Sequence, residues 1–206
     1  SFWHIRERRR SRKKLWLSNP CLSAFNSFSV TGASQVFAII GDPVDHSLSP
    51  IFWNQAFASI SLEAVYVPFR VLHNDLNEAI IGLKALGVRG INITKPHKHT
   101  AAEFCDRLYN PADELKAVNC IKFCEDGSTE GWNTDATGFL RIISRIGSFK
   151  CGLVMGSGGA AAAAIWALQQ NGARVFQIAR SLTSTLDSEQ INGIKRLSWH
   201  EKNFAH

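Results

Sequence analysis

The sequence has no apolar run approaching the about 18 residues that a membrane-spanning helix needs, so we expect no membrane partner. It also has no C-x-x-C pair, and no histidine lies at a metal-ligand interval from its cysteines, so no metal site is expected. The cysteines form an odd set: Cys21, Cys105, Cys120, Cys124 and Cys151. Such a set is typical of reduced thiols, which favours a cytoplasmic protein.

Outside its first residues, the sequence lacks an excess of charge of either sign. The formal net charge is +6, but residues 1–14 hold seven Lys or Arg residues and one acid, Glu7. Without this segment, the 23 basic and 17 acidic residues fall to 16 of each. A neutral body gives no electrostatic basis for binding a polyanion, so we expect no nucleic-acid partner.

Residues 1–34 are poor in acids, rich in Arg and Ser and without periodicity, so we predict a disordered basic extension. A transit peptide has the same composition, which leaves organelle targeting open. Because the chain begins at Ser1 rather than Met, an over-extended or partial gene translation explains the segment at least as well. The rest, with 45% apolar residues over the whole chain, suits a globular protein with one or two cores.

From Val36 onwards, apolar periodicity predicts alternating strands and helices. Strands are expected at 36–40, 64–69, 90–94, 118–123, 129–132, 152–155 and 174–178, with the fourth and fifth joined as a hairpin. Helices are expected from Pro50, after a cap at Asn74 or Asp75, at 96–105, 112–116 and 135–146, and from Ala160 to an end at Asn171-Gly172. Their expected inward residues are Ile51, Ala56, Phe57 and Ile60 in the first and Leu76, Ala79, Ile80, Leu83 and Leu86 in the second. This alternation indicates an α/β fold with parallel sheets in two units, 35–134 and 135–206.

A Gly-rich turn in the second unit follows a strand and opens a helix. Its residues are Gly156, Ser157, Gly158, Gly159, Ala160 and Ala161, the last in place of the third glycine of G-x-G-x-x-G. Glycines let the backbone approach a pyrophosphate, and the helix N-terminus offers it free N–H groups. This context predicts a dinucleotide site rather than a plain tight turn.

The residue after the next strand of such a unit selects the cofactor, since an acid binds a ribose 2′-hydroxyl and an Arg accommodates a 2′-phosphate. Arg180 stands there, so NADP is favoured and NAD remains possible.

Three clusters in the first unit carry candidate chemistry. Ser47 and Ser49 lie at an expected helix start, where the partial positive charge of the helix N-terminus favours binding of an anion. Ser49 is equally interpretable as a simple N-cap. Lys98 follows a strand end at an expected helix start, where the helix dipole opposes a cation, so a carboxylate partner is expected. Asp135 stands at a strand-to-helix turn, where an ordinary cap is the simpler interpretation.

Five segments together resemble the shikimate dehydrogenase family, in the right order and over about residues 36–181. They are Gly41 to Pro50 (GDPVDHSLSP), Asn92 to Lys98 (NITKPHK), Ala117-Val118-Asn119, Asn133-Thr134-Asp135 and the Gly-rich turn. The resemblance implies a substrate-binding N-terminal domain, a Rossmann-like domain and an active site between them.

The resemblance also implies a role for each matching residue. Ser47 and Ser49 would bind the substrate carboxylate, Thr94 and Asn119 the ring hydroxyls, and Lys98 and Asp135 would form the catalytic pair. The implied reaction is the NADPH-dependent, reversible reduction of 3-dehydroshikimate to shikimate in aromatic amino acid biosynthesis, by a monomer or homodimer acting on a small molecule. A quinate or bifunctional dehydrogenase using NAD, and an inactive remnant that only binds small acids, are the alternatives.

Several positions depart from the family pattern. Trp53 replaces the usual His, and Lys116 replaces Gly. Ala179 replaces Asn, and Ser184 replaces a second basic residue. Family members also continue for about 70 to 90 residues beyond the match, and residues 182–206 resemble none of that region. We therefore expect a C-terminally truncated chain that does not turn over substrate as it stands.

Overall fold

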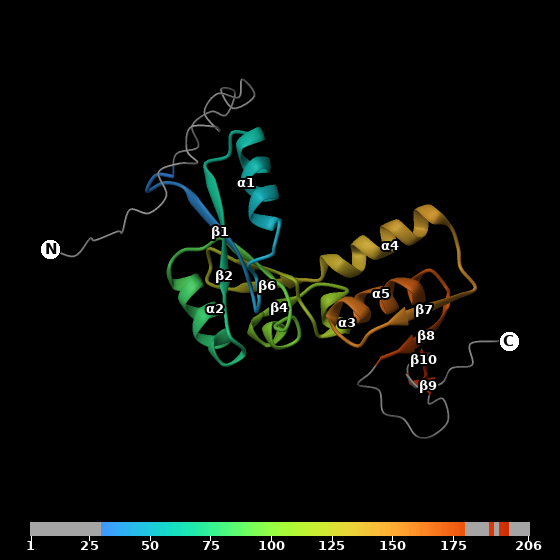
Figure 1. Ribbon diagram of the computed structural model, residues 1–206. Coiled ribbons are helices and arrows are strands. Elements are labelled where there is room, and N and C mark those ends of the chain that lie inside the picture. Colours follow the sequence, from blue (N-terminus) through green and yellow to red (C-terminus); the bar gives the residue numbers. More distant parts are fainter. Residues whose placement is uncertain (1–29, 180–189, 192–193, 198–206) are drawn as a thin grey trace, which may run out of the picture.

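The computed structural model describes residues 30–179, 190–191 and 194–197, which form two β-sheets and their helices (Figure 1). The first sheet has six strands in the order β2-β1-β3-β5-β6-β4, and the second has four in the order β7-β8-β10-β9. The predicted α/β fold with two units is confirmed. The boundary after residue 134 stays a prediction, and residues 1–29 of the predicted extension lie outside the described residues.

The first sheet is mixed, with both parallel and antiparallel strand pairs. Its parallel half consists of β1 (Gln35–Gly41), β2 (Ala64–Arg70) and β3 (Gly90–Ile93). The other half consists of β5 (Cys120–Phe123) and β6 (Thr129–Trp132), which form an antiparallel pair, and the short β4 (Arg107–Leu108), which is parallel to β6. The predicted hairpin between β5 and β6 is confirmed, whereas β4 was missed because two residues are too few to show a period.

Helices cover opposite faces of this sheet. Side chains alternate along β1, so Ala38 and Ile40 pack in the layer of α2 (Leu76–Ala85), which follows the 3₁₀ turn η2 (His73–Asp75). Ile39 instead packs in the layer of α1 (Ser49–Ser59), beside Phe57. Figure 1 shows the two helices on either side of the strands.

Three residues predicted to lie in the core are exposed. Ile51 is 60% exposed and Ile60 70%, because α1 packs mainly on the edge strand β2 and buries only Phe57. Leu86 is 81% exposed, because α2 ends at Ala85 and Gly87, with φ of 76°, turns the chain away from the core.

The predicted helix 96–105 is wrong. The chain forms a turn at 95–99 and then the 3₁₀ helix η3 (Thr100–Phe104), followed by α3 (Ala112–Leu115). The carbonyl of Lys98 accepts a bond of 2.8 Å from the backbone N–H of Val118, so a tertiary contact takes the place of a helical bond. Lys98 therefore lies in a turn, and the opposing helix dipole expected there does not exist.

The second sheet begins with β7 (Cys151–Met155), crosses over through α5 (Gly159–Gln170) and returns as β8 (Arg174–Ile178), parallel to β7. Val154, Ile165 and Val175 form its core. A further parallel strand, β10 (Ile194–Leu197), and the antiparallel β9 (Gln190–Ile191) extend it, which corrects the expectation of only two strands. Helix α4 (Thr134–Ile146) precedes β7 and packs against α5.

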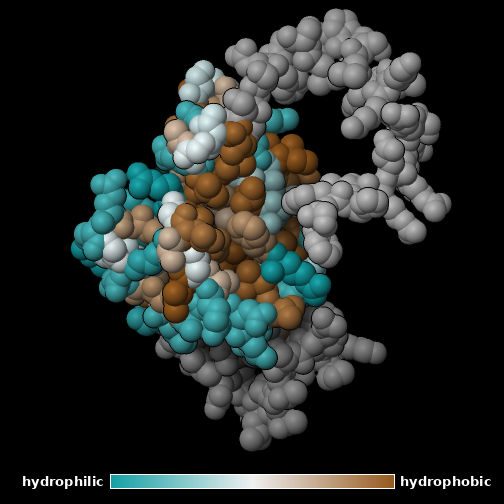
Figure 2. Space-filling view, turned by 90° about the vertical axis from the view of Figure 1, so that its left-hand side faces the viewer, coloured by the Kyte–Doolittle hydropathy of each residue, from teal (hydrophilic) through white to brown (hydrophobic). Residues whose placement is uncertain are grey.

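Apolar side chains remain exposed in both units. On β7, Leu153 is 49% exposed and Met155 74%. The side of the molecule that carries α1 and β2 presents a band of apolar surface (Figure 2), and Phe52 and Phe69 are among the exposed side chains of these elements. No helix within the described ranges is long and apolar enough to cross a membrane.

Candidate functional site

Lys98, Asn119 and Asp135 meet at one end of the first sheet. Lys98 lies in the turn after β3, Asn119 directly precedes β5, and Asp135 lies in the first turn of α4, which follows β6. The Lys98 ammonium donates to Oδ2 of Asp135, and the side chains are 17% and 31% exposed. The carboxylate partner expected for Lys98 is therefore Asp135, in a partly solvated position where an ion pair keeps more strength than at an open surface.

Asn119 fixes the other oxygen of this carboxylate. Its Nδ2 donates to Oδ1 of Asp135 at 2.8 Å and to the Thr134 hydroxyl at 2.9 Å. Its Oδ1 accepts a bond of 2.8 Å from the backbone N–H of Thr134. Both carboxylate oxygens of Asp135 thus have a donor, and Asn119, only 9% exposed, is held rigidly beneath them.

The cap of α4 is Asn133 rather than Asp135. The Asn133 side chain accepts a bond of 3.1 Å from the N–H of Ala136 and donates to the carbonyl of Ala117 at 3.0 Å. Because Asn133 satisfies the helix end, the simple capping interpretation of Asp135 is wrong, and its carboxylate is free to hold Lys98.

The two serines lie where β1 leads into α1. Ser49 is the first residue of α1, whose N-cap is Leu48 without a side-chain bond, so the N-cap interpretation of Ser49 is wrong. Ser47 Oγ accepts a bond of 3.3 Å from the N–H of Ser49, and both serines are partly exposed. Thr94 lies beside Gly41 of β1, where an added β-carbon would come within 2.2 Å of Thr94 Cγ2, so only glycine fits this crossing.

Two residues that sequence reasoning missed connect these groups. Tyr66 of β2 donates its hydroxyl to Oδ1 of Asn92 at 2.6 Å, and Nδ2 of Asn92 donates to the carbonyl of Asn119 at 3.2 Å. The available signal was a polar residue, Asn92, between the buried Ile91 and Ile93 of a short apolar strand.

The Gly-rich turn joins β7 to α5 and contains a backbone conformation that favours glycine. Gly156, with φ of 136°, adopts a conformation that favours glycine, and Gln177 Nε2 donates to its carbonyl at 2.8 Å. Helix α5 begins at Gly159 without a side-chain cap, and the position of a β-carbon on Gly158 is open. The first turn of α5, which includes Ala160, therefore presents its N-terminal end to an anion, with Ser157 in the loop before it.

The Gly-rich turn and the Lys98 cluster are adjacent. A β-carbon on Gly159 would lie 3.1 Å from Cδ of Lys98, so the lysine stem packs against the start of α5. A second contact joins the same helix to the first unit, because Trp166 Nε1 of α5 donates to Glu114 Oε2 of α3 at 2.7 Å. A ligand seated on the Gly-rich turn would thus lie close to the Lys98–Asp135 pair.

Arg180, the predicted 2′-phosphate contact, lies outside the described residues. Within the described part of the chain, His, Cys, Asp and Glu side chains form no group of three or more suited to a metal ion.

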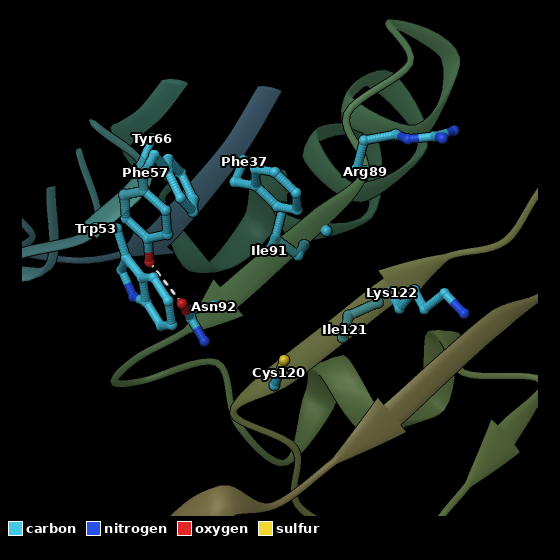
Figure 3. A pocket seen from close by; sticks show the side chains of 11 residues that line it. Phe37, Trp53, Phe57, Tyr66, Arg89, Ile91, Asn92, Cys120, Ile121 and Lys122 are labelled. Atoms are coloured by element: carbon cyan, nitrogen blue, oxygen red, sulfur yellow. Dashed lines mark hydrogen bonds between the residues drawn. The ribbon is translucent and has the colours of Figure 1, made fainter. Parts of the chain in front are cut away.

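A pocket of about 230 Å³ lies beside this site, on the α1 face of the sheet (Figure 3). Aromatic rings of Phe37, Trp53, Phe57 and Tyr66 form one wall, and Cys120 lies on the opposite wall. Burial raises the pKa of the Cys120 thiol, which keeps it protonated and unreactive. Tyr66 and Asn92 line this pocket and also belong to the hydrogen-bond network of the candidate site.

Comparison with known proteins identifies relatives of both units. The family model described as the shikimate dehydrogenase substrate binding domain matches residues 39–121. The NADP(+) shikimate dehydrogenase of Methanothermobacter thermautotrophicus is 44% identical over 146 residues, which cover 70% of this chain and 51% of that protein.

Solved structures of shikimate dehydrogenases are also similar to this chain. Shikimate dehydrogenase from Aquifex aeolicus superposes with a TM-score of 0.74 at 37% identity, covering 82% of this chain and 64% of that one. The enzyme from Thermus thermophilus, in complex with NADP(H) and shikimate, superposes with a TM-score of 0.64 at 35% identity, covering 71% and 56%. The chain spans about half the length of the curated relatives it matches. Over this shared part, the chain is similar to shikimate dehydrogenases, and residues 39–121 match their substrate binding domain.

Proposed function

We propose that this chain carries the site of an NADP-dependent shikimate dehydrogenase, which interconverts 3-dehydroshikimate and shikimate in aromatic amino acid biosynthesis. The observation that carries the proposal is the Lys98–Asp135 pair, held by Asn119 and adjoining an uncapped Gly-rich helix start. Residues 35–134 would bind the substrate, and residues 135–206 the nucleotide.

The side chains of the site would have different roles in binding and catalysis. Ser47 and Ser49 would donate to the substrate carboxylate near the start of α1, and Thr94 and Asn119 would contact ring hydroxyls. The Lys98 ammonium would hydrogen-bond the ketone oxygen and give it a proton as the alkoxide develops, with Asp135 holding the ammonium in place. Positioned proton transfer of this kind is worth about 10²–10⁴ in rate.

NADPH would supply the hydride to the carbonyl carbon when bound. Gly156, Ser157, Gly158, Gly159 and Ala160 would hold its pyrophosphate, and Arg180 its 2′-phosphate, since a guanidinium binds phosphate with two parallel hydrogen bonds. The packing of Lys98 against Gly159 supports a common site, because the nucleotide and the proton donor must both reach one carbonyl group.

We also propose a cytoplasmic location, a small-molecule partner and no nucleic-acid partner, with the protein a monomer or homodimer. The neutral charge balance of residues 15–206 supports the absence of a polyanion partner.

The test measures NADPH formation from shikimate and NADP⁺, in this chain and in a version extended by the C-terminal region of the Aquifex relative. Lys98→Ala in the active version should lower kcat at least about a hundredfold with little change in KM, since the lysine acts mainly in the transition state. Ser47→Ala should instead raise KM for shikimate and leave KM for NADP⁺ unchanged. Absence of both turnover and shikimate binding in both versions would contradict the proposal.

A further inference from the structure

Tyr66 is a buried phenol in a position that the reaction itself does not use. Its side chain rises from the centre of β2, is 4% exposed, and points its hydroxyl at Asn92 of β3 (Figure 3). The bond to Asn92 Oδ1, at 2.6 Å, is the end of a chain that continues from Asn92 Nδ2 to the carbonyl of Asn119. Tyr66 is thus linked to Asn119 of the candidate site through the side chain of Asn92.

One face of α1 is arranged around this tyrosine. Asn54 Nδ2 donates to the carbonyl of Tyr66 and Asn54 Oδ1 accepts from its N–H, each at 2.9 Å. The Trp53 ring stacks on the Tyr66 ring, with centroids 6.2 Å apart and 23° between the planes. Ser49, four residues before Trp53, lies on the same helix face. The helix that carries Ser49 is therefore locked to β2 at Tyr66.

The phenol keeps its proton at neutral pH. Burial raises the pKa of Tyr66 far above its usual value, Cys120 adds to the increase, and the nearby hydroxyl of Ser49 opposes it. The hydroxyl is thus a permanent donor to Asn92, and its oxygen remains able to accept a bond from Ser49.

We infer that Tyr66 is a positioning residue that fixes Ser49 relative to Asn92 and Asn119, and thereby sets the spacing between the carboxylate-binding and ring-binding parts of the substrate site. Ser49 belongs to a helix and Asn119 to the segment before β5, and a substrate that touches both needs them at a fixed separation. The inference rests on the proposed function, because it takes the substrate to be shikimate.

Tyr66→Phe tests this inference, because it removes the hydroxyl and keeps the ring that packs on Trp53. Tyr109→Phe is the matched control: Tyr109 donates to Glu130 at 2.7 Å and stacks on Trp132 at 4.9 Å, outside the Tyr66 network. An NMR titration with shikimate gives the dissociation constant of each protein, and thermal unfolding gives its stability.

We expect Tyr66→Phe to weaken shikimate binding about fivefold to tenfold, the effect of losing one or two hydrogen bonds that position the site. Tyr109→Phe should bind shikimate as the parent does. In a double-mutant cycle, Ser49→Ala and Tyr66→Phe together should weaken binding by less than the product of their separate effects, because Tyr66 acts partly through Ser49.

The outcomes separate the two proposals. A parent chain that binds shikimate, with Tyr66→Phe within twofold of it, overturns the positioning role alone. Equal weakening in Tyr109→Phe, or independent effects in the cycle, overturns it as well, because the loss would then reflect general loosening. A parent that binds no shikimate overturns the proposed function and this inference with it.

Discussion

Lys116 has a backbone conformation that costs free energy. It follows α3 with φ of 47° and ψ of 41°, the left-handed region in which a β-carbon crowds the backbone, and the family pattern has glycine at this position. Its side chain is exposed and forms no ion pair among the described residues. Lys116→Gly should therefore stabilise the protein.

The expected gain follows from two opposing terms. A non-glycine residue in this region costs about 1–2 kcal/mol. Replacing lysine with glycine removes this cost but adds an entropic cost of about 0.5–1 kcal/mol, because glycine loses more backbone entropy when the chain folds. The net stabilisation should be about 0.5–1 kcal/mol, which for a chain of this size raises Tm by about 1–4 °C.

Thermal unfolding followed by circular dichroism measures the shift, and Lys116→Ala is the control. Alanine also removes the lysine side chain but keeps the β-carbon, so it should leave Tm near that of the parent. If alanine stabilised the protein as much as glycine, the backbone argument would be wrong and the lysine side chain itself would be the source of the cost.

Two further predictions concern the site. Asp135→Asn should lower kcat at least about tenfold and reduce stability by about 1–3 kcal/mol, because Lys98 and Asn119 both donate to the carboxylate and an amide offers them one acceptor only. Steady-state kinetics and urea unfolding test this prediction. A change in kcat below about threefold, or ~0.7 kcal/mol, would exclude Asp135 from the mechanism. Arg180→Ala should reduce kcat/KM for NADP⁺ but not for NAD⁺, with modest discrimination in the parent because Ser184 replaces a second base; equal parental values for the two cofactors would refute the phosphate contact.

The sequence was sufficient for most elements and for the polar cluster. Alternation of apolar residues predicted β1, β2 and β3, and the position of Lys98 at a strand end predicted a carboxylate partner. The segments 95–104, 190–191 and 194–197 were predicted wrongly or missed, because some of their backbone bonds are made to distant parts of the chain. Local periodicity contains no information about such partners.

Burial on α1 shows a second limit. Helical spacing identifies which residues share a face, but Ile51 and Ile60 are exposed because α1 packs mainly on the edge strand β2. The Tyr66–Asn92 bond was equally unforeseeable, since it joins two strands that lie apart in sequence and depends on the order of strands in the sheet.

The contact between Gly159 and Lys98 constrains how this protein can vary. A glycine that opens a nucleotide-binding helix is normally explained by the needs of the nucleotide alone, yet here its missing side chain also leaves room for the stem of a lysine 61 positions earlier in the sequence. A side chain at position 159 would press on Lys98 even with no nucleotide present. A loss of activity in a Gly159 variant would therefore not by itself report on nucleotide affinity.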